Sequence, residues 1–195
     1  ILSYSRSARP FLENQVSISL STDLPLYYWA HRFSESGRLA DYRYLLSRAK
    51  RVLIDSAIAP EGAMAYPWPN PGAIRDLAFS RLLPVRRSIG QFLAAYSPAA
   101  IVDGLRRVTL DHAPNLAAEA RVLMVWLGER VQACGAAAEQ FSSAINALAP
   151  GKPGSFGVRF EYENSARYFR WSGDLATGQA LFEVDLGGGP TRLSA

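Results

Sequence analysis

The sequence predicts an α/β protein with a mostly parallel sheet, flanking helices and a small antiparallel β-rich region at its C-terminal end. Three observations predict this class. A strand, a helix and a second strand follow one another between residues 24 and 57, which suits a βαβ unit. Further helical patterns extend to residue 148 and enclose another strand candidate. After residue 154 the hydrophobic period changes from 3.6 to 2, which is typical of antiparallel strands.

The first half of the chain supplies the βαβ pattern. After a polar, connective start, residues 16–20 alternate strictly between apolar and polar side chains and predict a short strand or strand edge. Residues 24–30 form an apolar run rich in aromatic side chains, which predicts a buried strand. Residues 38–50 carry apolar side chains at helical spacing. Residues 51–57 then predict a buried parallel strand whose carboxyl end carries Asp and Ser.

The middle of the chain predicts further helices around one strand. Four prolines make residues 60–72 a proline-aromatic loop. A helical pattern covers residues 73–96, with a break or kink at Pro84. The remaining elements are a strand over residues 107–112, a helix over 115–133 and an alanine-rich helix over 136–148. This alternation predicts a Rossmann-like sheet with helices beside it.

The clearest boundary in the chain is the proline- and glycine-rich stretch at residues 149–154. Residues 155–187 after it predict an antiparallel meander of three strands joined by turns. We therefore expect an α/β domain over residues 1–149. A β-meander region over residues 150–195 would be packed on this domain or continuous with it.

Composition limits the classes of function. The net charge is +4, and basic residues are not gathered into a run, so we expect no nucleic-acid partner. No apolar stretch reaches the length of about 18 residues that a membrane span needs. The single cysteine, Cys134, excludes an internal disulfide and suits a reducing, cytoplasmic setting. The chain starts at Ile1 without methionine, and we expect it to be a fragment of a longer protein.

Polar side chains at predicted strand ends are the candidates for chemistry. His31, Asp55, Ser56 and His112 follow such strands, where ligands collect in α/β sheets. They suggest an alternative function, a domain that binds a sugar phosphate or a nucleotide, or an enzyme, with its site at the strand carboxyl ends. The spacing of histidines and the one cysteine fits no metal site, and no cofactor is expected. No G-x-S-x-G elbow is present, so a hydrolase triad is not indicated.

Arginine and tryptophan supply the candidates for partner binding. Arg81, Arg86 and Arg87 flank the break at Pro84 and could hold a partner's carboxylates or form a solvated face. Trp29 and Trp68 lie in aromatic-rich segments, and such side chains are enriched in binding hot spots.

Three segments together resemble the OpcA family. Residues 23–29, DLPLYYW, resemble a strand that the family writes as DLP-x-x-x-W, and residues 51–56, RVLIDS, resemble its R-[VL]-[IV]-[VI]-D-S strand. Residues 76–86, DLAFSRLLPVR, are similar to its D-L-x-W-x-R-L-x-P-W-R segment. Residues 125–130 add a similarity to a helix with W-L-x-x-R. The resemblance spans roughly residues 20–132, in the family's order and spacing.

The resemblance implies a protein without catalysis of its own. OpcA proteins bind glucose-6-phosphate dehydrogenase and promote its active, oligomeric form. This chain departs from the family pattern at Ala30, Phe79 and Val85, where the family has tryptophan. The family's N-terminal portion is missing. Cyanobacterial members regulate the partner through cysteine chemistry, for which this chain offers only Cys134.

Overall fold

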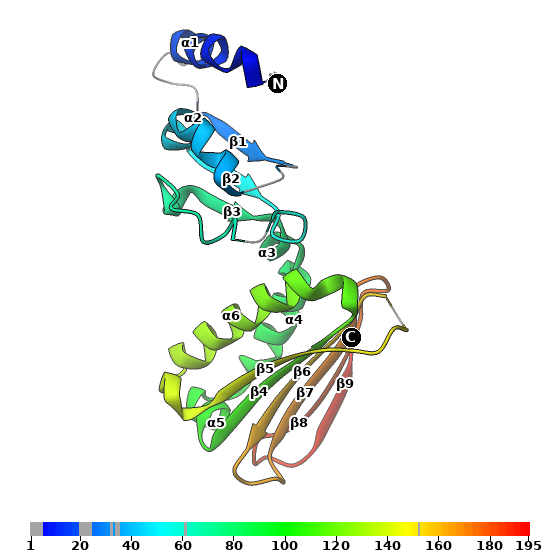
Figure 1. Ribbon diagram of the computed structural model, residues 1–195. Coiled ribbons are helices and arrows are strands. Elements are labelled where there is room, and N and C mark those ends of the chain that lie inside the picture. Colours follow the sequence, from blue (N-terminus) through cyan, green and yellow to red (C-terminus); the bar gives the residue numbers. More distant parts are fainter. Residues whose placement is uncertain (1–5, 20–24, 32, 34–35, 61, 152) are drawn as a thin grey trace. The chain divides into compact units, whose positions relative to one another are not determined.

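A computed structural model describes residues 6–19, 25–31, 33, 36–60, 62–151 and 153–195 of the protein (Figure 1). The chain forms two compact units, which comprise residues 1–77 and 78–195. The protein is a mixed α/β protein, as the sequence predicted, but its strands belong to two separate sheets. The boundary expected at residues 149–150 lies inside the second unit, between two strands of one sheet.

Unit 1, residues 1–77, contains the predicted βαβ arrangement. Its three strands pair in parallel in the order β1-β2-β3, and helix α2 lies between β1 and β2 in the chain. The elements are η1 (Arg6–Ala8), α1 (Arg9–Ser19), β1 (Tyr27–Ala30), η2 (Ser36–Tyr42), α2 (Arg43–Arg48), β2 (Arg51–Ile54), η3 (Pro71–Ala73) and β3 (Ile74–Asp76). The helix predicted over residues 38–50 is therefore part 3-10 and part α-helix.

The core of unit 1 lies on one face of this sheet. Alternate residues of the strands, among them Ala30, Val52 and Ile54, pack against Leu46 and Ala49 at the end of α2. The side chain of Trp68, from the proline-aromatic loop, completes the cluster. Strand residues of the opposite parity point to the other face, as the pleat requires.

The strand predicted over residues 16–20 is wrong where the structure describes it, because residues 9–19 form helix α1. Leu12 and Val16 are four residues apart, so both side chains lie on one side of the helix and pack on Leu45. The short run of alternating residues also fits a helical period, and packing decides between the two. Leu20 and residues 21–24, which include the start of the predicted strand 24–30, lie outside the described residues.

Unit 2, residues 78–195, is built on a six-stranded sheet with the order β5-β4-β6-β7-β8-β9. Strands β4 and β5 are parallel and all other neighbours are antiparallel. The strands are β4 (Leu105–His112), β5 (Ser142–Ala147), β6 (Ser155–Tyr162), β7 (Tyr168–Asp174), β8 (Gln179–Asp185) and β9 (Thr191–Ser194). The predicted meander is confirmed, and it continues the sheet of β4 instead of forming a region of its own.

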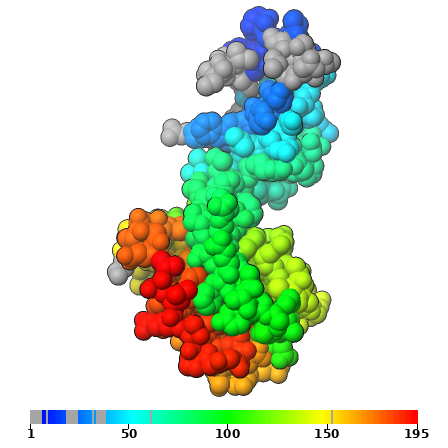
Figure 2. All heavy atoms as spheres, turned by 180° about the vertical axis from the view of Figure 1, so that it is seen from behind, coloured from blue at the N-terminus to red at the C-terminus, as the bar shows by residue number. Residues whose placement is uncertain are grey.

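Helices cover one face of this sheet. They are α4 (Leu83–Leu93), α5 (Pro98–Val102) and α6 (Ala117–Ala133), whose residues belong to the core of this unit. Helix α3 (Leu77–Arg81), which begins at the end of unit 1, precedes them, and η4 (Pro114–Leu116) and η5 (Ala138–Gln140) are short 3-10 turns. In Figure 2, α4 lies at the surface of unit 2 in green. The break expected near Pro84 is confirmed, since α3 and α4 are separated at Leu82 and Pro84 occupies the first turn of α4. The start of the expected 73–96 helix is instead strand β3 and part of η3.

The alanine-rich helix predicted over residues 136–148 is wrong. Residues 142–147 form the edge strand β5, which pairs in parallel with β4. Gly135 ends helix α6 with φ 108°, a left-handed conformation that favours glycine. The helix propensity of the residues after Gly135 alone favours a new helix. However, six of these residues pair with residues of β4 across the sheet, and this pairing outweighs the local helix propensity.

Aromatic rings from three strands fill the core of unit 2. Phe160, Phe169 and Phe182 are buried on β6, β7 and β8, and Phe92 of α4 stacks on Phe182 with a centroid separation of 4.2 Å. Trp171 is buried beside them and donates from Nε1 to Ser88 Oγ at 3.3 Å. The alternation of the strands thus directs one row of large side chains toward the helices.

Alkaline pH is expected to destabilise unit 2 through Tyr162. Its hydroxyl donates to the Ile101 carbonyl at 2.8 Å, and burial raises the pKa of Tyr162 well above its ordinary value of 10.0, while the nearby Arg167 charge opposes this only in part. The native state therefore keeps a proton that the unfolded chain loses, so stability is constant below pH about 10 and falls above it. Unfolding in urea between pH 8 and 12 measures this.

The Tyr162→Phe variant separates this effect from general alkaline denaturation. It is expected to lose about 1 kcal/mol at pH 8, because the Ile101 carbonyl loses its donor. Above pH 10 its stability is expected to fall less steeply than that of the wild type. Tyr27→Phe, at a ring that is 58% exposed, is the control with an unchanged slope. Equal slopes for the wild type and Tyr162→Phe contradict the prediction.

Candidate partner-binding surface

The carboxyl ends of the three parallel strands hold three of the four strand-end residues predicted from the sequence. His31 follows β1, and Asp55 and Ser56 follow β2. Ser56 also meets a residue that sequence reasoning did not single out for this edge: its hydroxyl donates to Asp76 Oδ2 at 2.7 Å and its amide donates to Asp76 Oδ1 at 3.1 Å. The Asp76 carboxylate thus ties β3 to the loop after β2.

Among the residues that the structure describes at this edge, the groups that would activate a serine nucleophile are not brought together. Activation of a serine needs a base within hydrogen-bond reach and a third group that orients it. The partner of Ser56 is a carboxylate, while the ring of His31 lies against Trp29 with centroids 4.7 Å apart. His112 belongs to the other unit, is buried in β4, and donates from Nδ1 to the Ala113 carbonyl at 2.8 Å. The four predicted residues are therefore not one cluster.

The predicted arginines occupy different environments. Arg81 binds Glu119 of α6, with Nη2 2.7 Å and Nε 3.1 Å from Oε1, and Glu119 is buried. This geometry gives Arg81 a role in holding α3 to α6. Arg86 lies over the Phe79 ring at 3.5 Å from its centroid, and burial lowers the pKa of its guanidinium. Arg87 is exposed on α4.

The two predicted tryptophans also differ. Trp68 is buried in the core of unit 1, with its ring edge-on to Tyr66 at 5.1 Å, so it serves packing and does not present a surface for a partner. Trp29 is 58% exposed. Its strand β1 is an edge strand, and its side chain points to the face of the sheet opposite the core.

The residues beside Trp29 form a surface that sequence reasoning did not assemble. The strand register aligns Trp29 with Leu53 and Arg75, and Tyr27 with Arg51. All five side chains share the face opposite the core, which we call the aromatic–arginine face. Tyr27 is also 58% exposed, and Arg75 is exposed. Knowledge of the strand register was needed to find Arg51 and Arg75.

The charge of the aromatic–arginine face is not compensated by ion pairs among the described residues. Arg51 donates from Nη1 to the Lys50 carbonyl at 2.8 Å, and Arg75 donates from Nη1 to the Gly72 carbonyl at 3.0 Å. Both bonds go to backbone oxygens, so both guanidinium groups can also bind a carboxylate. The face thus combines two exposed aromatic rings with two cations.

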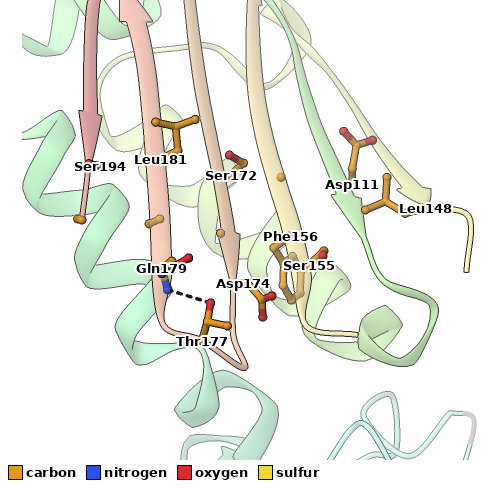
Figure 3. A pocket seen from close by; sticks show the side chains of 14 residues that line it. Asp111, Leu148, Ser155, Phe156, Ser172, Asp174, Thr177, Gln179, Leu181 and Ser194 are labelled. Carbon is orange, nitrogen blue, oxygen red and sulfur yellow. Dashed lines mark hydrogen bonds between the residues drawn. The ribbon is translucent and has the colours of Figure 1, made fainter. Parts of the chain in front are cut away.

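A hollow of about 1070 Å³ lies on the open face of the six-stranded sheet, and Figure 3 shows its side chains. Hydroxyl residues such as Ser155, Ser172 and Ser194 line it, together with the carboxylates of Asp111 and Asp174. Asp111 pairs with Arg159 at 3.0 Å, and Asp174 accepts from the Ala176 amide at 2.8 Å. Of these two carboxylates, Asp111 is compensated by an arginine, whereas Asp174 is bonded to a backbone amide.

Within the described ranges no cluster of three or more histidine, cysteine, aspartate or glutamate residues could hold a metal ion. None of the helices there is long and apolar enough to cross a membrane. No protein-family model matches this chain, and no curated protein matches it. The site is therefore judged from its own residues.

Proposed function

We propose that this chain is a non-catalytic, partner-binding protein that assembles or allosterically activates glucose-6-phosphate dehydrogenase. The resemblance to the OpcA family suggests the partner. One observation supports binding as the activity: the exposed aromatic–arginine face of unit 1, on which Trp29 and Tyr27 are each 58% exposed.

Parallel sheets are normally covered on both faces, because their strands are apolar on both sides. The sheet of unit 1 is covered by α2 and the Trp68 loop on one face, and it exposes two large rings on the other. Removing the exposed part of one such ring from water is worth about 2–4 kcal/mol before the costs of association. Binding of a partner that covers this face is therefore favoured by the burial of the two rings.

Tryptophan, tyrosine and arginine are the residues most enriched in binding hot spots. The guanidinium groups of Arg51 and Arg75 form paired hydrogen bonds with carboxylates more readily than with other groups. The face therefore fits an apolar protein surface that carries aspartate or glutamate side chains. We propose that the dehydrogenase presents such a surface.

Trp29→Ala is expected to weaken binding of the dehydrogenase at least about 30-fold, which corresponds to about 2 kcal/mol, because the largest ring at the centre of the face is lost. Arg75→Ala is expected to weaken it about tenfold, and more strongly at low salt. Calorimetry or interferometry with the purified dehydrogenase from the same organism measures both. The matched controls are Phe11→Ala, at a ring that is 68% exposed on α1, and Arg43→Ala on α2.

The proposal as a whole is tested with the unmodified chain. Co-purification, the oligomer size of the dehydrogenase and its turnover are measured with and without this protein. Association with a change in turnover or oligomer size supports the proposal. If the chain neither associates nor alters either property, the proposal is wrong. If it associates and the controls weaken binding as much as Trp29→Ala does, a different surface carries the binding.

The alternative function, binding of a sugar phosphate or a nucleotide, has its support in the position of His31, Asp55 and Ser56 at one carboxyl edge. A thermal-shift screen with both compound classes at millimolar concentration tests it. Stabilisation that Ser56→Ala removes favours this function. Absence of stabilisation by every compound contradicts it.

A further inference from the structure

An apolar pocket of about 440 Å³ lies in unit 2 between helices α4, α5 and α6. In Figure 2 the green surface of α4 and α5 lies beside the yellow-green end of α6, where the pocket is located. Its apolar lining includes Ile89, Leu93, Ile101, Trp126, Leu127 and Phe160. A pocket of this volume and composition is in the range that binds small molecules.

Small residues on facing helices keep the pocket open. Gly90 on α4 and Ala94 at the C-cap of α4 line the pocket, and Ala133 lines it from α6. A Cβ atom placed on Gly90 meets no other atom within 4 Å. Glycine in the middle of a helix costs about 0.5–1 kcal/mol relative to alanine. The chain therefore has a destabilising residue where a larger one would fit and would fill the space.

One cation lies at the margin of this apolar surface. Arg130, in the last turn of α6, lines the pocket and makes no ion pair among the residues that the structure describes. Tyr96 lines the pocket too and brings a hydroxyl donor. Apart from these two groups, the Cys134 thiol and the indole N–H of Trp126, the lining residues have no polar side-chain group.

We propose that this pocket binds an apolar monocarboxylate of about the size of a medium-chain fatty acid. The chain of the ligand lies among the rings and aliphatic side chains, and its carboxylate pairs with Arg130. A carboxylate has the planar geometry that a guanidinium binds through two parallel hydrogen bonds. Its single charge matches the single cation. A phosphate group would bring a larger charge to the C-terminal end of α6, where the helix dipole is negative.

Cys134 provides a direct readout, because it lines the pocket and is the one cysteine of the chain. Alkylation of its thiol is timed with and without decanoate, below the concentration at which micelles form. At ten times its Kd, decanoate is expected to slow alkylation roughly tenfold, since only the free protein reacts. Decanol, which has the same chain without the charge, is expected to protect much less. The melting temperature is followed in parallel.

Two variants with matched controls locate the ligand. Gly90→Leu fills the pocket and is expected to remove protection by decanoate, while the fold is retained because the added side chain enters open space. Gly128→Leu on α6 is its control, since added atoms there also meet nothing and Gly128 does not line the pocket. Arg130→Gln is expected to reduce the protection by decanoate to that by decanol. Arg121→Gln, on the same helix outside the pocket, is expected to keep it.

Three outcomes would contradict the proposal. If decanoate at millimolar concentration changes neither the alkylation rate nor the melting temperature, the proposal is wrong. It is also wrong if decanol protects as well as decanoate, because the ion pair with Arg130 then plays no part. Protection that needs no ligand and grows with protein concentration would show that a second copy of the chain covers the pocket. That outcome overturns the proposal as well.

Discussion

Phe169→Ala is expected to lower the free energy of unfolding of unit 2 by about 3–5 kcal/mol, the range for removal of a buried phenylalanine ring. Phe169 is 0% exposed at the centre of the sheet. Its ring lies 5.0 Å from that of Phe160, 6.1 Å from that of Phe92 and 6.5 Å from that of Phe182. Alanine would leave a cavity that three neighbours line, and strands paired on both sides leave them little room to close it.

Urea unfolding, monitored through hydrogen exchange of the backbone amides of β6, β7 and β8, measures this loss of stability in unit 2 itself. Amides of β1 and β2 in unit 1, whose core is a separate cluster, serve as the internal reference. Phe11→Ala is the control, because its ring is 68% exposed and surface substitutions stay within about 0.5 kcal/mol. A loss below about 1 kcal/mol for Phe169→Ala would contradict the packing described for this core.

The sequence predicted best those elements whose own residues decide their structure. Residues 155–162 alternate apolar and polar side chains, and in the sheet every second one, such as Phe156 and Phe160, is buried. Pro84 broke the expected helix where its missing N–H is tolerated, in the first turn of α4. In both cases the local preference and the packing agree, so the pattern alone was sufficient.

Elements that depend on distant partners were the ones predicted wrongly. Residues 142–147 are mostly exposed and have little apolar pattern, so only the free edge of β4 makes them a strand. The pairing of β4 with β6 in turn places β4 and β5 in one sheet with the C-terminal meander. The boundary drawn at residues 149–154 marked a turn, because a proline- and glycine-rich stretch suits a loop between strands as well as a linker between domains.

The candidate site shows the same limit. Trp29 and Trp68 both lie in aromatic-rich segments, and their sequences do not distinguish the exposed ring from the buried one. Arg51 and Arg75 were missed because only the register of β1, β2 and β3 brings them beside Trp29 and Tyr27. Glu119 was missed as the partner of Arg81, since 38 residues separate them. Long-range pairing leaves no local signal for any of these contacts.

Arg81→Met is expected to destabilise unit 2 by about 2–3 kcal/mol, because it leaves the Glu119 carboxylate buried without its counter-ion. The side chain of Glu119 is 6% exposed, and one of its oxygens, Oε2, has no hydrogen-bond partner even with Arg81 present. The expected loss lies below that of a fully buried pair, since the Arg81 side chain is 44% exposed and water screens part of the interaction.

Replacement of both partners separates the cost of an unpaired charge from the worth of the pair. The double variant Arg81→Met with Glu119→Leu is expected to recover most of the loss, because apolar side chains of similar volume can replace a buried ion pair at little cost. Arg106→Met, which breaks a pair whose side chains are 66% and 60% exposed, is the control and is expected to cost less than about 0.5 kcal/mol. If Arg81→Met costs no more than this control, the pair does not stabilise unit 2.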